Sequence, residues 1–536
     1  MPAAKRQRAI AIGGGIGGLT AGALLAKRGW DVTVYDRALV PGGCASTFKR
    51  RGFTFDVGAT QVAGLEPGGI HHRIFAELGI ELPAATPCDP ACAVFLPGES
   101  EPINVWRDPE RWEAERQRQF PGSEPFWQLL ARLFDASWRF QTRDPVLPPR
   151  NLWDAWQLVA AVRPDTLATV PFALATVGDA LHLYGLAGDR RLRTFLDMQL
   201  KLYSQVSAAE TALLYAATAL GVSQAPRGLF HLQGSMQVLS DRLVAALEKY
   251  GGRLCLRHTV ERVHIDGVRV TGVTVCDRRT GATRNESADE VVANVTVGNL
   301  LQLLGRRDRP RSAPSRSRFD SARTLAALAA ELQLRGYERR VDKLPTPSGG
   351  FVIYLGVEQR AIPEGCPPHL QFLYDYDGPV AEQNTLFVSV SKPGDGRAPD
   401  GKATIVASSF VEAAPWWCGS QADYEQRKQS FCDNALARLG DYFHLDAEAI
   451  VHQESATPRT FQHFTAREFG YVGGVGQRLA TFGPFGFATR TPVRHLWLVG
   501  DSVHPGEGTA GVSYSALTVV RQIEALASRG KPRLNR

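Results

Sequence analysis

Apolar runs and helical apolar repeats alternate at the start of the chain. Residues 9–12 form an apolar run that predicts a buried parallel strand. Apolar side chains then recur at helical spacing until Gly29, and residues 32–35 form a second apolar run that leads to Asp36. A strand, a helix and a strand over so short a stretch are typical of a βαβ unit. The N-terminus therefore predicts a doubly wound α/β domain.

Helical patterns dominate residues 109–221, with breaks where prolines occur. The part from 151 to 222 is unusually apolar and aromatic, and four arginines lie between its apolar patches. A plain helical domain with a buried core explains this composition. The alternative is an apolar tunnel whose mouth rests on a bilayer, with the arginines facing lipid headgroups. These arginines are Arg163, Arg190, Arg191 and Arg193.

Strand patterns return in the second half of the chain. A helix over 240–250 is expected to lead into a strand over 259–263, and residues 268–275 and 285–292 predict the two strands of a β-hairpin. The run 496–499 predicts a strand, followed by a helix that starts near residue 511. Four further runs predict the strands of a mixed or antiparallel second sheet: 351–357, 369–374, 385–391 and 403–410.

Glycines follow the first predicted strand at the G-x-G-x-x-G spacing. Gly13 permits the tight turn, Gly15 lets a pyrophosphate approach the backbone, and Gly18 lets helix and strand pack closely. Ile16 and Gly17 lie inside the turn, where the free N–H groups of a helix start favour an anion. Because strand, glycines, helix and second strand come in register, the segment predicts a dinucleotide site.

The acid and the glycine pair that follow extend this site. Asp36 would accept hydrogen bonds from a ribose diol and repel a 2′-phosphate. Gly42 and Gly43 are small residues where a flat ring could pass, and residues 52–60 read as an extended segment.

A second glycine-rich segment closes the chain's cofactor pattern. The strand 496–499 ends on Gly500 and Asp501, and Asp501 at the carboxyl end of this strand is well placed to accept a hydrogen bond from a cofactor. Glycines recur from 506 to 511, and the helix that follows would direct its positive end at the cofactor ring. This arrangement would favour hydride acceptance by the ring.

The order of these motifs resembles the flavin-binding N-terminus of the amine oxidase and phytoene desaturase superfamily. The resemblance implies FAD as the cofactor, and a strand that brings the backbone of Val260 to the adenine. The chain has Asp36 where the family usually has Glu, and Cys44 where many relatives have Arg, so one possible phosphate contact is missing. The residues assigned to the cofactor are Gly13, Gly15, Ile16, Gly17, Gly18, Asp36, Gly42, Gly43, Val260, Gly500, Asp501, Gly508 and Val512.

The motif HPG-x-G at residues 504–508 resembles the carotenoid branch of this superfamily. The amino-acid sequences of residues 42–61 and 500–525 are most similar to those of the cyanobacterial carotenoid 3′,4′-desaturases. The resemblance implies an oxidoreductase acting on CH–CH groups, which desaturates a polyene in myxol-type carotenoid biosynthesis. The polyene would transfer a hydride to FAD, and oxygen or a quinone would then accept the electrons from the flavin. His504 and Glu507 are the polar side chains expected beside the ring and are the candidate catalytic residues.

Three rival functions stay open at this point. A carotene cis–trans isomerase would use the same fold with reduced FAD and give no net oxidation. An amine oxidase-like flavoenzyme would need an aromatic cage and a Lys–water pair, and no sequence feature locates either. A carotenoid or lipid carrier that retains FAD for stability would not be an enzyme.

The expected fold class is α/β, with a discontinuous Rossmann-type FAD-binding domain, a mixed α+β substrate domain and a helical membrane-facing subdomain. The FAD-binding domain is expected to comprise residues 1–80, 225–300 and 465–536. The substrate-binding domain is expected to comprise 81–224 and 301–464, of which 109–222 is mainly helical.

Composition adds limits to this interpretation. The chain has 536 residues, which is too long for one simple core, and a net charge of +7. This charge suits an anionic membrane surface better than nucleic acid, because no recognisable nucleic-acid motif surrounds the basic residues. The eight cysteines show no metal-ligand spacing, and no metal is expected; reduced thiols would suit a cytoplasmic protein. With no apolar stretch of about 18 residues, a protein peripheral to a membrane surface is expected.

One further segment bears on the membrane. Residues 305–318 are rich in Arg, Ser and Pro and have almost no apolar side chains, which predicts a solvated loop. The alternative is that this basic segment is attracted to anionic lipid.

Overall fold

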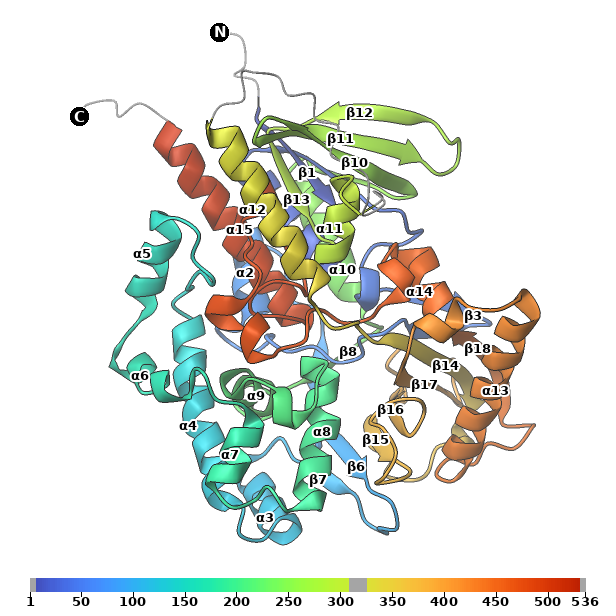
Figure 1. Cartoon of the computed structure of the whole chain (residues 1–536). Coiled ribbons are helices and arrows are strands. Elements are labelled where there is room, and N and C mark those ends of the chain that lie inside the picture. The colour runs from blue at the N-terminus through green and yellow to red at the C-terminus, as the bar shows by residue number, and fades with distance from the viewer. Residues whose placement is uncertain (1–5, 308–324, 531–536) are drawn as a thin grey trace.

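A computed structural model describes residues 6–307 and 325–530 of the chain. Its first sheet has five parallel strands in the order β19-β13-β1-β2-β9. These strands come from the beginning, the middle and the end of the described chain (Figure 1). They are β1 (Arg8–Ile12), β2 (Asp31–Tyr35), β9 (Arg253–Cys255), β13 (Glu290–Ala293) and β19 (Leu496–Leu498). The predicted α/β sheet, with the first two strands paired in parallel, is confirmed.

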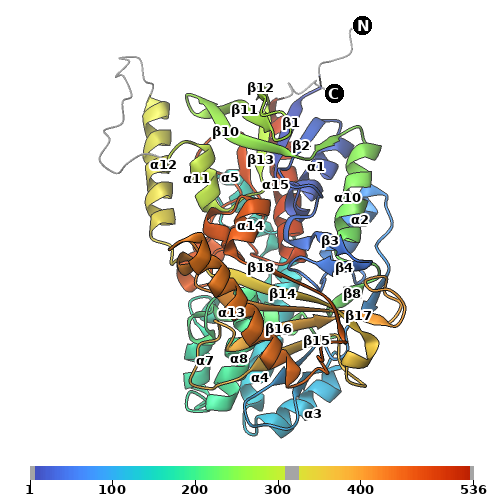
Figure 2. The same cartoon turned by 90° about the vertical axis from the view of Figure 1, so that its right-hand side faces the viewer.

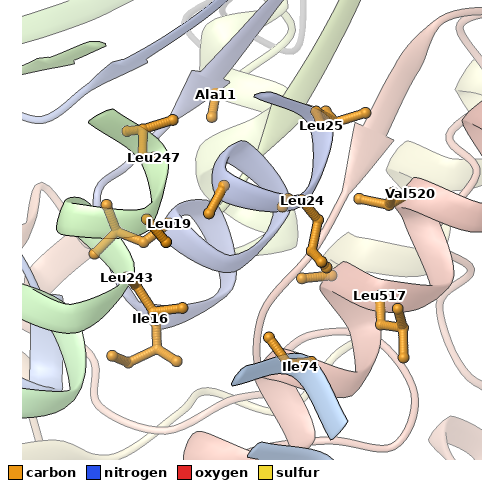
Figure 3. Close-up of a cluster of buried hydrophobic side chains, with 14 of the residues drawn as sticks. Ala11, Ile16, Leu19, Leu24, Leu25, Ile74, Leu243, Leu247, Leu517 and Val520 are labelled. Atoms are coloured by element: carbon orange, nitrogen blue, oxygen red, sulfur yellow. The ribbon is translucent and has the colours of Figure 1, made fainter. Parts of the chain in front are cut away.

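Helix α1 (Ile16–Lys27) is the centre of the first hydrophobic core. It is apolar all round, as a fully buried helix has to be, and its residues from 16 to 26 are all buried. Figure 3 shows Leu19 beside Leu243 of α10 (Gln237–Lys249), and Leu24 beside Leu517 of α15 (Thr509–Gly530). Helix α2 (Ile70–Leu78) closes the same core through Ile74.

The second sheet is mixed and has seven strands in the order β18-β14-β17-β16-β15-β6-β7. The four strands predicted from the sequence form its middle, and β15 pairs in parallel only with β6. Helix α13 (Gln421–Gly440) lies across one face of the sheet (Figure 2), where apolar side chains of both elements form a core. The strands are β6 (Cys92–Phe95), β7 (Ile103–Val105), β14 (Gly349–Glu358), β15 (His369–Leu373), β16 (Thr385–Val390), β17 (Lys402–Val411) and β18 (Ile450–Ala456).

The predicted helical region forms one group, at the lower left of Figure 1. Prolines stand at or near the first position of several of these helices, where the missing N–H costs no hydrogen bond. The helices are α3 (Pro109–Gln119), α4 (Glu124–Gln141), α5 (Leu152–Ala161), α6 (Pro164–Leu167), α7 (Val177–Leu183), α8 (Arg190–Ser204) and α9 (Leu213–Gly221).

The predicted hairpin over 268–275 and 285–292 forms, but its second strand ends at Ser287 and not at residue 292. β11 (Arg269–Asp277) pairs antiparallel with both β10 (His258–Asp266) and β12 (Thr283–Ser287), and β13 then leaves to join the first sheet. Burial explains why β12 and β13 belong to different sheets, because β12 is mostly exposed whereas all four residues of β13 are buried. A strand buried on both faces belongs in the middle of a parallel sheet.

Short elements connect these layers. β3 (Thr47–Arg50) and β4 (Phe53–Asp56) form a hairpin, and β5 (Ala85–Pro87) pairs with β8 (Phe230–Leu232). The remaining helices are α11 (Val297–Leu303), α12 (Leu325–Asp342) and α14 (Pro458–Thr465). Of the predicted solvated segment 305–318, residues 308–318 lie outside the described residues.

Candidate functional site

A cavity of about 1500 Å³ connects the first sheet with the helical group and the second sheet. At one end its wall is formed by the turn after β1, the segment after β2, the start of β10 and the start of α15. At the other end its wall is formed by α4, α5, α9 and the inner face of the second sheet. The carboxyl edge of the parallel sheet, where such sheets bind ligands, therefore opens directly into the interior of the substrate part.

The start of α1 fits a pyrophosphate. Gly15, Ile16 and Gly17 line the cavity, and among the described residues no side chain caps this helix at Gly15. Its first N–H groups and the positive end of the helix dipole are thus available to an anion. A side chain at Gly18 would collide with the carbonyl oxygen of Gly13, so only glycine allows the helix this close to the strand end.

The Asp36 carboxylate is fixed at the cavity wall by two backbone donors. The Gly14 N–H donates to Oδ2 at 2.6 Å, and the Ala38 N–H donates to Oδ1 at 2.7 Å. Burial raises the pKa of Asp36, and these two N–H groups oppose the rise. Asp36 lines the cavity, where the remaining lone pairs of the carboxylate are placed to accept from a diol.

Two further predicted segments lie beside this turn. The Gly42 N–H donates to the Gly14 carbonyl at 2.8 Å, and a Cβ added at Gly43 would lie 3.3 Å from Gly15 Cα. The backbone of β10 is joined to the end of β2, because the His258 N–H donates to the Asp36 carbonyl at 2.8 Å. Val260, two residues further on, is thereby brought to the cavity wall.

Asp501 carries a partner that the sequence did not indicate. The Arg467 guanidinium forms an ion pair with Asp501 and donates to the Gly473 carbonyl at 2.7 Å. Gly474 packs against the Asp501 backbone so closely that a Cβ would collide with its carbonyl oxygen. The segment of residues 470–474 thus contacts both the backbone of Asp501 and its ion-pair partner Arg467.

Glu507 is a half-buried carboxyl group at the cavity wall, with two kinds of donor. Gln205 Nε2 lies 3.1 Å from Oε1 and 3.3 Å from Oε2, and the Gly474 N–H donates to Oε2 at 3.2 Å. Burial, with the nearby negative charge of Asp501, raises the pKa of Glu507 to about 8, against the effect of these donors and of Arg467. Glu507 can therefore hold or release a proton near neutral pH.

His504 is buried and, like Glu507, contacts the side chain of a glutamine. Gln141 Nε2 of α4 lies 3.0 Å from His504 Nε2, and the orientation assigned to the Gln141 amide decides which tautomer the imidazole takes. Burial lowers the pKa of His504 to about 4, so the ring is neutral at pH 7. Within the described part of the chain its Nδ1 is buried without a hydrogen-bond partner.

The closing helix begins two residues earlier than predicted. α15 starts at Thr509 and not near Gly511, so Gly508 immediately precedes its first turn. Gly508 and Val512 line the cavity, and a Cβ at Gly17 would lie 3.4 Å from the Val512 carbonyl oxygen. The N-terminal ends of α1 and α15 therefore meet at the same end of the cavity.

Asn294 is the main site residue that the sequence analysis missed. Its side chain lies within 3.0 Å of the Cβ positions of Gly15, Gly17 and Gly500, and its Nδ2 donates to the Gly13 carbonyl at 3.4 Å. One signal could have identified it, because Asn294 follows directly after the buried run of β13, at the ligand-binding edge of a parallel sheet. Arg467, Gln141 and Gln205 had no comparable signal, since they lie outside recognisable motifs.

The outer wall of the cavity carries exposed apolar side chains. Leu158 and Val162 line the cavity from α5 and the residue that follows it, while Trp156 and Val159 of the same stretch are exposed. We call the exposed apolar residues around this wall the α5 patch: Leu152, Trp156, Val159, Leu167, Val170 and Leu174. Among the described residues no helix combines the length and the apolar run needed to cross a bilayer.

Two of the four arginines form ion pairs within the chain. Arg190 forms an ion pair with Asp377, and Arg191 forms one with Glu99, so these two cations already have carboxylate partners. Arg163 is exposed and stands between α5 and α6, next to the α5 patch.

Comparisons with known proteins agree over nearly the whole chain. A family profile described as an NAD(P)-binding Rossmann-like domain matches residues 12–78. Prolycopene isomerase 2 of an Oncidium hybrid cultivar is 25% identical and aligns over 97% of this chain and 84% of its own length. A zeta-carotene-forming phytoene desaturase of Myxococcus xanthus is 27% identical, over 96% of this chain and 94% of that protein.

Solved structures show the same architecture. An oxidoreductase from Methanosarcina mazei superposes with a TM-score of 0.58 at 18% identity, covering 96% of this chain and 100% of that one. Wild-type putrescine oxidase bound to putrescine superposes with a TM-score of 0.57 at 16% identity, covering 98% of this chain and 99% of the oxidase. At these identities the similarity establishes the fold.

Proposed function

Because the chain belongs to the FAD-dependent carotenoid desaturase and isomerase family, within the amine oxidase superfamily, we propose that it desaturates a carotenoid. It is an oxidoreductase, and its cofactor is FAD. The bond that we propose it oxidises is the 3′,4′ bond at the end of the polyene, as in myxol-type carotenoid biosynthesis.

The observation that carries this proposal is the continuity of the cavity. The dinucleotide turn and the apolar wall of α4, α5 and α9 belong to one space of about 1500 Å³. A space of this size, lined mainly by apolar groups of packed helices and a sheet, suits a long hydrophobic substrate better than a small polar one. Burial in such a site removes water from the reacting carbons.

We propose that the cofactor is held along the carboxyl edge of the first sheet. The start of α1 would bind the pyrophosphate, Asp36 the adenosine ribose, and the Val260 backbone the adenine. Gly42, Gly43 and Asp501 would contact the remaining length, with the start of α15 facing the ring system. FAD bound there supplies a hydride acceptor. Residues 1–80, 225–300 and 465–536 would make up the domain that binds it.

The chain's own groups supply the rest of the chemistry. Desaturation removes a hydride from one carbon and a proton from its neighbour. Glu507 in its carboxylate form is the group that we propose receives this proton, since its pKa of about 8 keeps both forms accessible near neutral pH. Neutral His504 would orient the substrate or the cofactor by a hydrogen bond, because its pKa of about 4 makes it a weak base.

A cis–trans isomerase is the second candidate. The prolycopene isomerases align over 96–97% of this chain, as fully as the desaturases do. An isomerase would use the same cavity and leave the mass of the carotenoid unchanged. An amine oxidase, the third candidate, would have to bind a cation in the same cavity.

We also propose that the α5 patch rests on a membrane surface. Trp156 and Leu152 are 65% and 87% exposed, and α5 and Val162 next to it also line the cavity. A hydrophobic substrate could then pass from lipid into the cavity without crossing water. The electron acceptor that reoxidises FAD is proposed to be oxygen or a quinone dissolved in the same lipid.

The test is to incubate the FAD-loaded protein with single carotenoids in liposomes and to analyse products by chromatography and mass. A loss of two hydrogens, with a red-shifted absorption spectrum, is expected of the desaturase. A product of unchanged mass and altered retention would establish the isomerase instead. Flavin reduction by amines, with no change in any carotenoid, would overturn both, and repeating the assay without oxygen but with a quinone identifies the acceptor.

A further inference from the structure

Gln205 is a residue of the helical group that reaches into the cofactor end of the cavity. It follows the last residue of α8, and its backbone has φ = 65°, in the left-handed region that favours glycine or asparagine. A strained backbone position occupied by a larger side chain points to a use for that side chain. Here the side chain contacts Glu507.

The contact between Gln205 and Glu507 involves both carboxyl oxygens. Gln205 Nε2 lies 3.1 Å from Oε1 and 3.3 Å from Oε2, so one amide group faces the whole carboxyl group. Gly473 also packs closely against the amide, because a Cβ at Gly473 would collide with it. Across the described ranges, Gln205 Oε1 is buried and has no hydrogen-bond partner.

This arrangement can serve two protonation states of Glu507. With the amide as placed, Nε2 donates to the carboxylate. With the amide turned by 180° about its terminal bond, Oε1 takes the place of Nε2 and accepts from the O–H of the protonated carboxyl group. The Gly474 N–H, 3.2 Å from Oε2, serves as a donor to either state.

The charged and titratable groups around Glu507 come from several elements. The negative charge of Asp501, shortly after β19, disfavours the carboxylate form of Glu507. The positive charge of Arg467, shortly after α14, favours it. The charge on Glu507 also acts to raise the pKa values of three neighbouring groups, which are Lys201 of α8, Cys44 and Tyr215 of α9. Within the described residues none of these charged or titratable groups hydrogen-bonds to the Glu507 carboxyl group, whose partners are the Gln205 amide and the Gly474 N–H.

We propose that Gln205 is a positioning residue, which holds the Glu507 carboxyl group in place in both its protonation states and so lets it take up and release a proton. The inference rests on the proposed function for its purpose, since the carbon that loses a proton beside the cofactor needs a group to receive it. Gln205 itself touches Glu507, and acts on the reaction only through it.

The test follows the Glu507 carboxyl group directly. Infrared difference spectra of the FAD-loaded protein, recorded without carotenoid between pH 6 and pH 10, would show the C=O band of a protonated carboxyl group, and the Glu507→Gln variant identifies that band. Gln205→Met keeps the size of the side chain but removes the amide. Its C=O band is expected to shift in frequency, because the protonated carboxyl group loses its acceptor. Its titration midpoint is expected to rise by about one pH unit, because the lost hydrogen bond to the charged carboxylate is stronger than the lost hydrogen bond from the neutral acid.

Gln141→Leu is the matched control, since it removes a glutamine that contacts His504 and not Glu507. It should leave the band and its midpoint unchanged. A Gln205→Met protein with the wild-type band and midpoint would overturn the proposal. If Gln205→Met does not fold, Gln205→Asn replaces it: its amide is one methylene too short to face both oxygens, and the same shift is expected.

A second readout separates this inference from the proposed function. If carotenoid reduces the flavin, the pH dependence of the reduction rate in Gln205→Met should shift in the same direction as the infrared midpoint. If no carotenoid reacts, the infrared result still stands or falls alone, so failure of the desaturase proposal is distinguishable from failure of the role of Gln205.

Discussion

Asn294 and the glycines around it are closely packed. A Cβ at Gly15 would lie 2.7 Å from Asn294 Nδ2, and a Cβ at Gly13 would lie 2.8 Å from the Asn294 carbonyl oxygen. Neither the Asn294 backbone nor a glycine turn buried beneath it can yield easily. This crowding makes the turn sensitive to any added atom.

Gly15→Val is therefore expected to abolish flavin binding. The added side chain would meet Asn294 on one side and the proposed pyrophosphate position on the other, and the affinity for FAD should fall by more than about 100-fold. FAD content of the purified protein, read from its yellow colour and absorbance, measures the effect. Gly188→Ala is the control, because its Cβ has nothing within 4 Å; a Gly15→Val protein that stays yellow would argue against the site.

Glu507 should leave a mark on the pH dependence of stability. Its pKa is raised to about 8 in the folded protein, above the ordinary value of 4.5, so the folded state keeps a proton that the unfolded state loses. The contribution of Glu507 is fully present below about pH 4.5 and is lost as the pH rises towards 8, by up to about 1.4 kcal/mol per pH unit.

Chemical denaturation of the wild type and of Glu507→Gln at pH 5, 6, 7 and 8, at equal FAD loading, checks this. The free energy of unfolding of the wild type, relative to that of the variant, is expected to fall steadily over this range. A constant difference between the two proteins would mean that the folded pKa of Glu507 is not raised.

Sequence patterns located single residues unevenly. Gly13, Gly15 and Asp36 could be predicted, because a local motif joins a strand end, a tight turn and a helix start. Arg467 and Gln205 could not, because their partners Asp501 and Glu507 are distant in sequence and only the folded chain brings them together. Long-range polar pairs leave no periodicity in the sequence.

At the scale of elements, a buried polar network joins the β16–β17 connection of the second sheet to β4, β8 and the start of α10. Arg397, in the connection between β16 and β17, donates from Nε to Asp56 Oδ2 at 3.0 Å and from Nη1 to Asp395 Oδ2 at 3.2 Å. His231 of β8 lies 2.8 Å from the same Asp395 oxygen. Asp56 ends β4 and accepts from the Met236 N–H in front of α10, so one guanidinium connects the second sheet to the cofactor part.

Arg397→Met is expected to destabilise the protein by about 3–5 kcal/mol, because it leaves two buried carboxylates without their cation. The free energy of unfolding, measured at fixed FAD concentration, gives the effect. Arg360→Met is the comparison: Arg360 and Asp446 form an ion pair with side chains 51% and 54% exposed, and its loss should cost less than about 1 kcal/mol. Equal effects of the two substitutions would contradict the role of the network.

The strands of the second sheet show how far patterns reach at this scale. Residues 351–357 and 403–410 were predicted as strands and pair with each other, because long apolar runs identify them. The membership of β6 in the same sheet could not be predicted, since more than two hundred residues separate it from its partner β15. The error at residues 285–292 has the related cause that one extended run serves two sheets.

At the scale of the molecule, the α5 patch predicts a measurable affinity for lipid. Trp156→Ser with Val159→Ser removes two exposed apolar side chains of α5, and cosedimentation with anionic liposomes should fall by about tenfold or more. Ile265→Ser, an exposed apolar residue of β10, is the control. Undiminished binding of the double variant would place the lipid contact elsewhere on the molecule.

The strand order of the first sheet has a consequence for how the chain is made. β1 and β2 leave the ribosome first, but β13 follows some 250 residues later, and the edge strand β19 comes only near residue 496. At bacterial or eukaryotic rates of synthesis, roughly 20–90 s pass between β2 and β19. During this time the apolar helix α1 lacks its cover from α15. A nascent chain of this protein should therefore depend on chaperones until β19 and α15 have emerged, and should acquire its flavin only after that.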